Sequence, residues 1–187
     1  MHSIDDLRLE LSVKARNGLD FITAALIVWT AIAFVWRLPL SAYDRAVITF
    51  IVGGPMILLA RLFSRILGTT WTVPDNPLQP LGLWLNFAQL FYFPILIFVL
   101  IRQPDYFVLV YVIITAAHFF PYAWYYRVRA YAIMAGVASV GSMFVALITS
   151  QEQLFLIPAF MAVCLLILAV WLQVVWRRNV EVYSSKR

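Results

Sequence analysis

The chain has 187 residues, of which 64% are apolar, 16% aromatic and 12% charged, and its formal net charge is +5. Soluble domains average about 25% charged residues, and one of this length has too little interior to bury so much apolar surface. The composition therefore excludes a soluble globular domain and a disordered chain. The single cysteine, Cys164, excludes an intrachain disulfide and a thiolate metal cluster.

Six apolar stretches are each long enough to cross a lipid bilayer as a helix. A crossing helix needs about 20 mostly apolar residues, and the alternation of period two that is typical of barrel strands is absent from these stretches. The sequence predicts an all-α, polytopic membrane protein, a six-transmembrane-helix bundle with an N-terminal amphipathic helix. The expected spans are Gly18–Trp36, Ala46–Phe63, Leu81–Ile101, Tyr106–Tyr126, Ala130–Thr149 and Leu154–Trp176.

The chain is predicted to have three parts: a cytoplasmic amphipathic helix over residues 1–17, a transmembrane domain over 18–176 and a cytoplasmic tail over 177–187. In the first part, Ser3 and Asp6 fit a capping box, and Leu7 and Leu11 share one helix face. We expect this helix to lie on the inner membrane surface or on the bundle; a helix that docks a partner protein is the alternative.

Prolines and small residues mark positions where the spans depart from plain apolar helices. Prolines inside a helix remove hydrogen bonds, so we expect kinks at Pro55, Pro94, Pro121 and Pro158. The loop over residues 68–80 has a proline at every third position from Pro74, which favours an extended strap. The fifth span carries a stripe of small residues that favours close packing, within the chain or across a homodimer. The stripe consists of Ala132, Ala135, Ser139, Ser142 and Ala146.

The basic residues predict the orientation of the spans. Eleven Lys and Arg residues fall on the side of the termini, against three on the other side, and basic loops stay in the cytoplasm. Both termini are therefore predicted to be cytoplasmic. The eleven are Arg8, Lys14, Arg16, Arg61, Arg65, Arg127, Arg129, Arg177, Arg178, Lys186 and Arg187; the three are Arg37, Arg45 and Arg102.

Six polar residues within or at the edges of the spans are the candidate ligand-binding residues: His118, Gln89, Asn86, Tyr122, Asp20 and Arg61. Polar groups in a membrane usually face the bundle interior or a cavity. Gln89 and His118 each lie nine residues from the inner end of an antiparallel span, which places both about 13 Å deep. This common depth predicts one pocket that opens to the cytoplasm, with His118 as the group whose charge changes near neutral pH.

Three functions fit these residues. The preferred one is binding of a small molecule or lipid in the polar pocket, with a role related to permeation. The alternative is a structural or assembly protein in which the same residues only bond helices together, while Asp20 and Arg61 extend to the headgroups. The third is a lipid-modifying enzyme that uses His118 and Tyr122.

Enzymatic activity is left open, but the sequence favours its absence. No nucleophile motif, metal-binding motif or phosphate-binding loop is present, and no carboxylate pair has a helical spacing. We therefore assign no catalytic residue and expect no metal and no cofactor. The expected partners are the lipid bilayer, a small-molecule or lipid ligand and a second copy of the chain through the fifth span, with no nucleic acid.

Two stretches of the sequence resemble an uncharacterised family of small bacterial integral membrane proteins, a family defined by a domain of unknown function. The first runs from Asn76-Pro77 through Leu81-Gly82-Leu83, Asn86 and Gln89-Leu90 to Tyr92, and the second is Ala117-His118-Phe119-Phe120-Pro121-Tyr122-Ala123-Trp124. The resemblance covers most of the chain. It implies a location in the bacterial inner membrane and directs attention to Asn86, Gln89, His118, Pro121 and Tyr122, but it implies no substrate.

Overall fold

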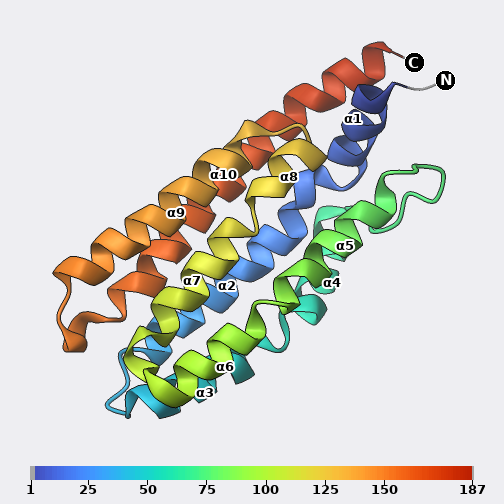
Figure 1. Ribbon diagram of the computed structural model, residues 1–187. Helices are drawn as coiled ribbons and strands as arrows, with labels where there is room; N and C mark the ends of the chain where they lie inside the picture. Colours follow the sequence, from blue (N-terminus) through green and yellow to red (C-terminus); the bar gives the residue numbers. More distant parts are fainter. Residues whose placement is uncertain (1–2, 187) are drawn as a thin grey trace.

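The computed structural model describes residues 3–186, and every regular element in that part of the chain is a helix (Figure 1). Residues 1, 2 and 187 lie outside the described residues. Arg187, which was counted to predict the orientation, is one of these three. Among the described residues, six spans are long and apolar enough to cross a membrane, which confirms the predicted six-span helical fold. The helices are α1 (Ile4–Lys14), α2 (Leu19–Val35), α3 (Ala42–Gly53), α4 (Met56–Leu67), α5 (Gln79–Leu90), α6 (Phe93–Arg102), α7 (Phe107–Ala117), α8 (Phe120–Tyr125), α9 (Arg129–Ile148) and α10 (Leu156–Ser185), with short 3₁₀ turns at Arg16–Gly18, Pro104–Tyr106 and Gln151–Gln153.

Three of the spans are divided into two helices each, and proline lies at each division. α3 ends at Gly53 and α4 begins directly after Pro55. Pro94 and Pro121 are the second residues of α6 and α8, where a helix needs no N–H donor. Pro158 differs from the prediction of a kink, because it is the third residue of α10 and the helix simply begins around it.

The helix α2 is at the centre of the bundle. Its most extensive contacts are with α10 on one side and α4 on the other, and Ala24 and Ile32 are completely buried. In Figure 1, α9 and α10 form one edge of the molecule, and α3–α4 with α5–α6 form the opposite edge. Almost no residue of the α5–α6 span is buried inside the chain, so this span offers most of its surface to its surroundings.

The small residues of α9 pack within the chain. Ala135, Ala138 and Ser142 are buried, and α9 makes extensive contacts with α7 and α10. A Cβ atom on Gly141 would lie 2.6 Å from the ring of Phe160 in α10, so only glycine permits this approach. Of the five residues of the predicted stripe, Ala135 and Ser142 are thus buried inside the chain, while the homodimer remains a prediction.

The last helix extends well beyond the thickness of a membrane. α10 has 30 residues and is about 45 Å long, compared with about 30 Å for the hydrocarbon core. The segment assigned to a tail therefore continues the helix as far as Ser185. The helix α1 lies along this extension: the indole Nε1 of Trp176 donates to the carbonyl of Val13 at 3.0 Å, and the amide of Asn179 donates to Oγ of Ser12 at 2.7 Å. Of the two predicted positions for α1, the structure shows the one on the bundle, with both described chain ends at the same end of the molecule (Figure 1).

Candidate functional site

Two of the six predicted site residues, Asn86 and Tyr122, meet at the carbonyl of Gly82 in α5, and a third, His118, packs against Tyr122. The side-chain amide of Asn86 donates to this oxygen at 2.9 Å, within the same helix. The hydroxyl of Tyr122, from α8, donates to the same oxygen at 3.4 Å. The ring of His118 stands edge-on to the ring of Tyr122, with 5.3 Å between centroids. The structure thus brings these residues together from the two spans that the depth argument paired.

Asp20 and Arg61 meet through a third side chain rather than as an ion pair. Asp20 is only 3% exposed, and its Oδ2 accepts from the hydroxyl of Thr69 at 2.7 Å and from the indole Nε1 of Trp71 at 2.9 Å. The guanidinium of Arg61 lies over the Trp71 ring, 4.9 Å from its centroid. The sequence did not single out Trp71, because nothing in the sequence shows that the 68–80 strap folds back onto the first span.

Gln89 is half-buried, and its side chain makes no hydrogen bond with the described part of the chain. None of the six predicted residues lines either of the two cavities described below. The hydrogen bonds of Tyr122 and Asp20, which join different segments, fit the alternative in which polar groups bond helices and loops together. A ligand at these six positions therefore stays a prediction.

The larger cavity lies at the end of the molecule that carries both termini. Its volume is about 650 Å³, it is open to the outside, and it lies between α1, the turn from α8 to α9, and α10. Its polar side is charged, and its other side is apolar, formed by Trp171 and Val175 of α10 with residues of the turn. The lining residues are Asp5, Arg8, Ala123, Arg127, Val128, Arg129, Ala130, Trp171 and Val175. The smaller cavity, about 410 Å³, is lined only by apolar residues of α5 and the residue that follows it.

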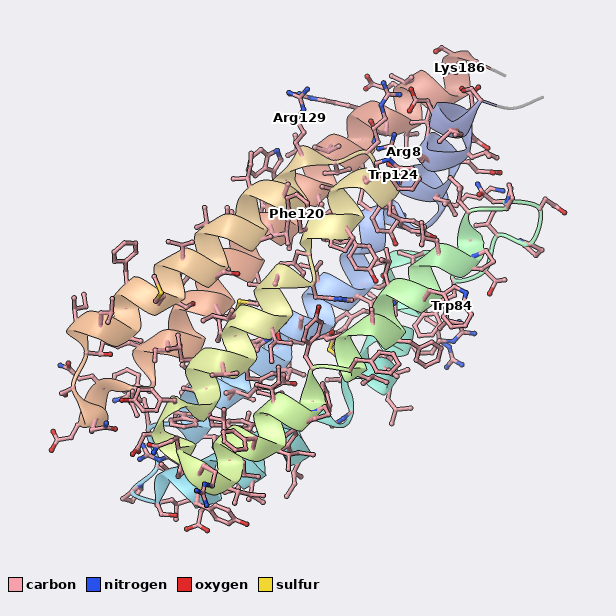
Figure 2. All side chains as sticks on the ribbon, viewed as in Figure 1. Arg8, Trp84, Phe120, Trp124, Arg129 and Lys186 are labelled. Atoms are coloured by element: carbon pink, nitrogen blue, oxygen red, sulfur yellow. The ribbon has the colours of Figure 1, made fainter. Side chains whose placement is uncertain are left out.

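Arg8 is held rigidly at the wall of the larger cavity. Its Nε donates to the carbonyl of Trp124 at 2.6 Å, and its guanidinium lies 4.7 Å from the centroid of the Trp124 ring (Figure 2). Its Nη1 donates to Asp5 at 3.1 Å, and the side chain is only 14% exposed. The predicted capping box of Ser3 and Asp6 is present and fixes the first turn of α1, on which Asp5 and Arg8 stand. Arg8 therefore presents its charge from a position set by three contacts.

The turn between α8 and α9 places the other two arginines. The N–H of Val128 bonds to the carbonyl of Ala123 at 3.0 Å, and Arg127 has the left-handed backbone, φ 58°, that such a helix end requires. Glycine is the usual residue at this position, because a side chain there costs about 1–2 kcal/mol. Nη1 of Arg127 lies 3.6 Å from Asp5, whereas Arg129 has no ionic partner among residues 3–186 and extends outward from the start of α9 (Figure 2).

The lining of the cavity carries a formal charge of +2, since three arginines face one aspartate. No nucleophile with an adjacent base is part of this lining, so the arrangement is suited to binding rather than to a reaction. The sequence analysis used Arg8, Arg127 and Arg129 only to orient the spans. Their convergence was missed because Arg8 is more than 100 positions away from the other two, and only the docking of α1 brings them together.

Comparisons with known proteins agree with the fold but add no reaction. No curated protein and no solved structure matches the chain. A family of unknown function matches residues 4–175, which includes all six spans up to the apolar part of α10. This match confirms the resemblance that the sequence motifs indicated, and the chain belongs to this family of unknown function, DUF7010.

Proposed function

We propose that this protein binds a lipid of the cytoplasmic leaflet, with the polar end of the lipid in the cavity between α1, the α8–α9 turn and α10. The observation that carries the proposal is the two-sided character of the cavity. Arginine side chains form one side, and the exposed indole of Trp171 and the side chain of Val175 form the other. A site for an amphiphile requires this combination of a charged and an apolar wall.

The position of the cavity along the helices supports a lipid rather than a ligand from bulk water. α9 begins at Arg129 and α8 ends at Tyr125, so the turn lies where two spans leave the hydrocarbon. Trp171 and Trp124 lie near this level, and tryptophan side chains prefer the membrane–water interface. A headgroup at this depth has its acyl chains beside the apolar half of α10.

We further propose that the cavity faces the cytoplasm of a bacterial cell, from a multi-pass protein of the inner membrane. The support is the excess of basic residues at the end that carries both termini. A reporter that is active only in the cytoplasm should be active when fused after the last residue and inactive when fused in the 37–41 loop. The reverse pattern would contradict this orientation.

Lipid retention by the purified protein tests the proposed function. Trp171→Ala removes the largest apolar side chain of the lining without changing charge, so native mass spectrometry should show fewer retained lipids for this variant than for the wild type. Trp84→Ala is the matched control, because Trp84 is 68% exposed on α5 and lines only the smaller cavity. Equal lipid retention by both variants and the wild type would refute a lipid site at Trp171.

A structural or assembly role is the second candidate, and it too rests on observations. The hydrogen bonds of Asn86, Tyr122 and Asp20 all join groups of the protein itself. A thermal-shift screen that compares the wild type with His118→Ala and Gln89→Ala separates this structural role from a ligand at the six predicted polar residues. Lower stability with no ligand-dependent shift in any variant favours the structural role, whereas a shift that is lost only in these variants favours a ligand at the polar residues.

A further inference from the structure

Resting on the proposed lipid site, we infer that the cavity between α1, the α8–α9 turn and α10 selects a phosphate-bearing, negatively charged ligand, which Arg8, Arg127 and Arg129 hold. The lining contains three guanidinium groups, no lysine and one carboxylate. Guanidinium groups form paired hydrogen bonds to phosphate oxygens, and a zwitterionic or neutral headgroup offers less to such a set.

The three arginine side chains differ in how firmly the protein holds them, which suits a site that closes on an anion. Arg8 is fixed by the Trp124 carbonyl, the Trp124 ring and Asp5. Arg127 is 58% exposed and Arg129 is exposed without an ionic partner among the described residues 3–186. The charge of Arg8 is thus held in place before an anion binds. The side chains of Arg127 and Arg129 are exposed and can turn toward an anion without breaking a strong contact.

The start of α9 adds a second source of positive potential. Val128 is the residue before the helix, and it has no side-chain cap for the first amides. Arg129 and Ala130, the first two residues of α9, line the cavity. The first N–H groups of a helix lack partners inside the helix, and the helix dipole makes this end positive. A phosphate in the cavity would therefore meet backbone donors as well as guanidinium groups.

Asp5 occupies part of the place that the anion would take. Its Oδ1 lies 3.1 Å from Nη1 of Arg8 and its Oδ2 lies 3.6 Å from Nη1 of Arg127, so one carboxylate bridges two of the arginines. Asp5 is half exposed and stands on the first turn of α1. It acts as an internal competitor, and Asp5→Asn should therefore strengthen anion binding.

The test measures binding of lipids with identical acyl chains to the full-length protein in detergent. Phosphatidic acid and phosphatidylglycerol are compared with phosphatidylcholine and diacylglycerol, and inorganic phosphate and glycerol 3-phosphate are added as soluble competitors. We expect the two anionic lipids to bind more tightly. Arg127→Gln and Arg129→Gln should each weaken them about five-fold, and Asp5→Asn should strengthen them by a similar factor, because a basic residue at a membrane surface contributes about 1 kcal/mol.

Arg65→Gln is the control variant, because Arg65 is exposed at the same end of the bundle but does not line the cavity. Equal affinity for anionic and zwitterionic lipids, or an equal loss with Arg65→Gln, would overturn the phosphate inference. The proposed lipid site would survive that result if Trp171→Ala still lowered lipid retention, and would fail if it did not. If glycerol 3-phosphate binds as tightly as the anionic lipids and displaces them, the result would support phosphate recognition and identify a soluble phosphate ester as the ligand.

Discussion

Replacing Asp20 by alanine tests how the 68–80 strap is held against the first span. The carboxylate accepts three hydrogen bonds: from Thr69 at 2.7 Å, from Trp71 at 2.9 Å and from the backbone N–H of Phe21 at 3.0 Å. Thr69 has a second acceptor, Oγ of Ser64 at 2.9 Å, so it keeps a partner in the variant. The indole N–H of Trp71 has no other acceptor among residues 3–186 and would be left unpaired.

The expected cost follows from these contacts. An unpaired buried donor costs about 1–3 kcal/mol, and a hydrogen bond to a charged group contributes about 1.5–3 kcal/mol. Removing the carboxylate also removes the cost of burying its charge, which offsets part of this loss. We therefore expect Asp20→Ala to lower the free energy of unfolding by about 2–3 kcal/mol, and Asp20→Asn, which keeps one acceptor oxygen, by about 1 kcal/mol.

Unfolding in mixed micelles, followed by tryptophan fluorescence, measures this difference. The matched control is Asp75→Ala, because Asp75 belongs to the same strap but is exposed. Quenching by acrylamide should also increase in Asp20→Ala, as Trp71 leaves its position between Phe21 and Arg61. If Asp20→Ala and Asp75→Ala unfold at the same denaturant concentration, the strap is not held by Asp20 and the reasoning is wrong.

Three further changes test other contacts. Gly82→Ala puts a Cβ atom 2.8 Å from the Tyr125 hydroxyl and should lower the free energy of unfolding by about 1–2 kcal/mol. Adding Tyr125→Phe should restore part of this loss, and no recovery in the double variant would refute the contact. Gly141→Ala should cost about 1–3 kcal/mol in the same unfolding assay, because its Cβ would meet a phenylalanine ring of α10 at 2.6 Å. Hydrogen bonds from Lys186 and Ser3 lower the pKa of Asp6 from 3.8 to about 2, so this carboxylate stabilises the fold above pH 3.8, and the contribution is lost as the pH falls through about 2. Spin labels at the first turn of α1 and the last turn of α10 should move apart over that range, and Lys186→Gln should weaken the pH dependence, because Ser3 still lowers the pKa of Asp6.

The positions of the spans and their breaks could be predicted from the sequence because their causes are local. Hydrophobic length decides that a segment crosses the bilayer, and a proline lacks its N–H wherever it lies. The divisions near Pro55, Pro94 and Pro121 were expected on this ground. Pro158 shows the limit of the local argument, because its effect depends on where α10 begins, and the Ser150–Gln153 turn decides that.

The depth of polar residues was also readable from the sequence, but their partners were not. Counting residues paired the third and fourth spans at one level, and Asn86 and Tyr122 indeed reach the same carbonyl. Counting residues also placed Asp20 and Arg61, which have opposite charges, at the same end of the bundle. In the structure the side chain of Trp71 lies between them. Helix rise gives height along the membrane normal, whereas the direction of a side chain around the helix depends on which neighbours pack against it.

Composition and hydrophobic length were enough to identify six segments able to cross a membrane, and the sequence motifs indicated the family to which the chain belongs. The docking of α1 on the extension of α10, which brings Arg8 to Arg127 and Arg129 across more than 100 residues of chain, became visible only in the folded molecule. The physical reason is that transfer into lipid acts on each segment separately, residue by residue. A cavity exists only between segments, and its shape follows from how their side chains fit together.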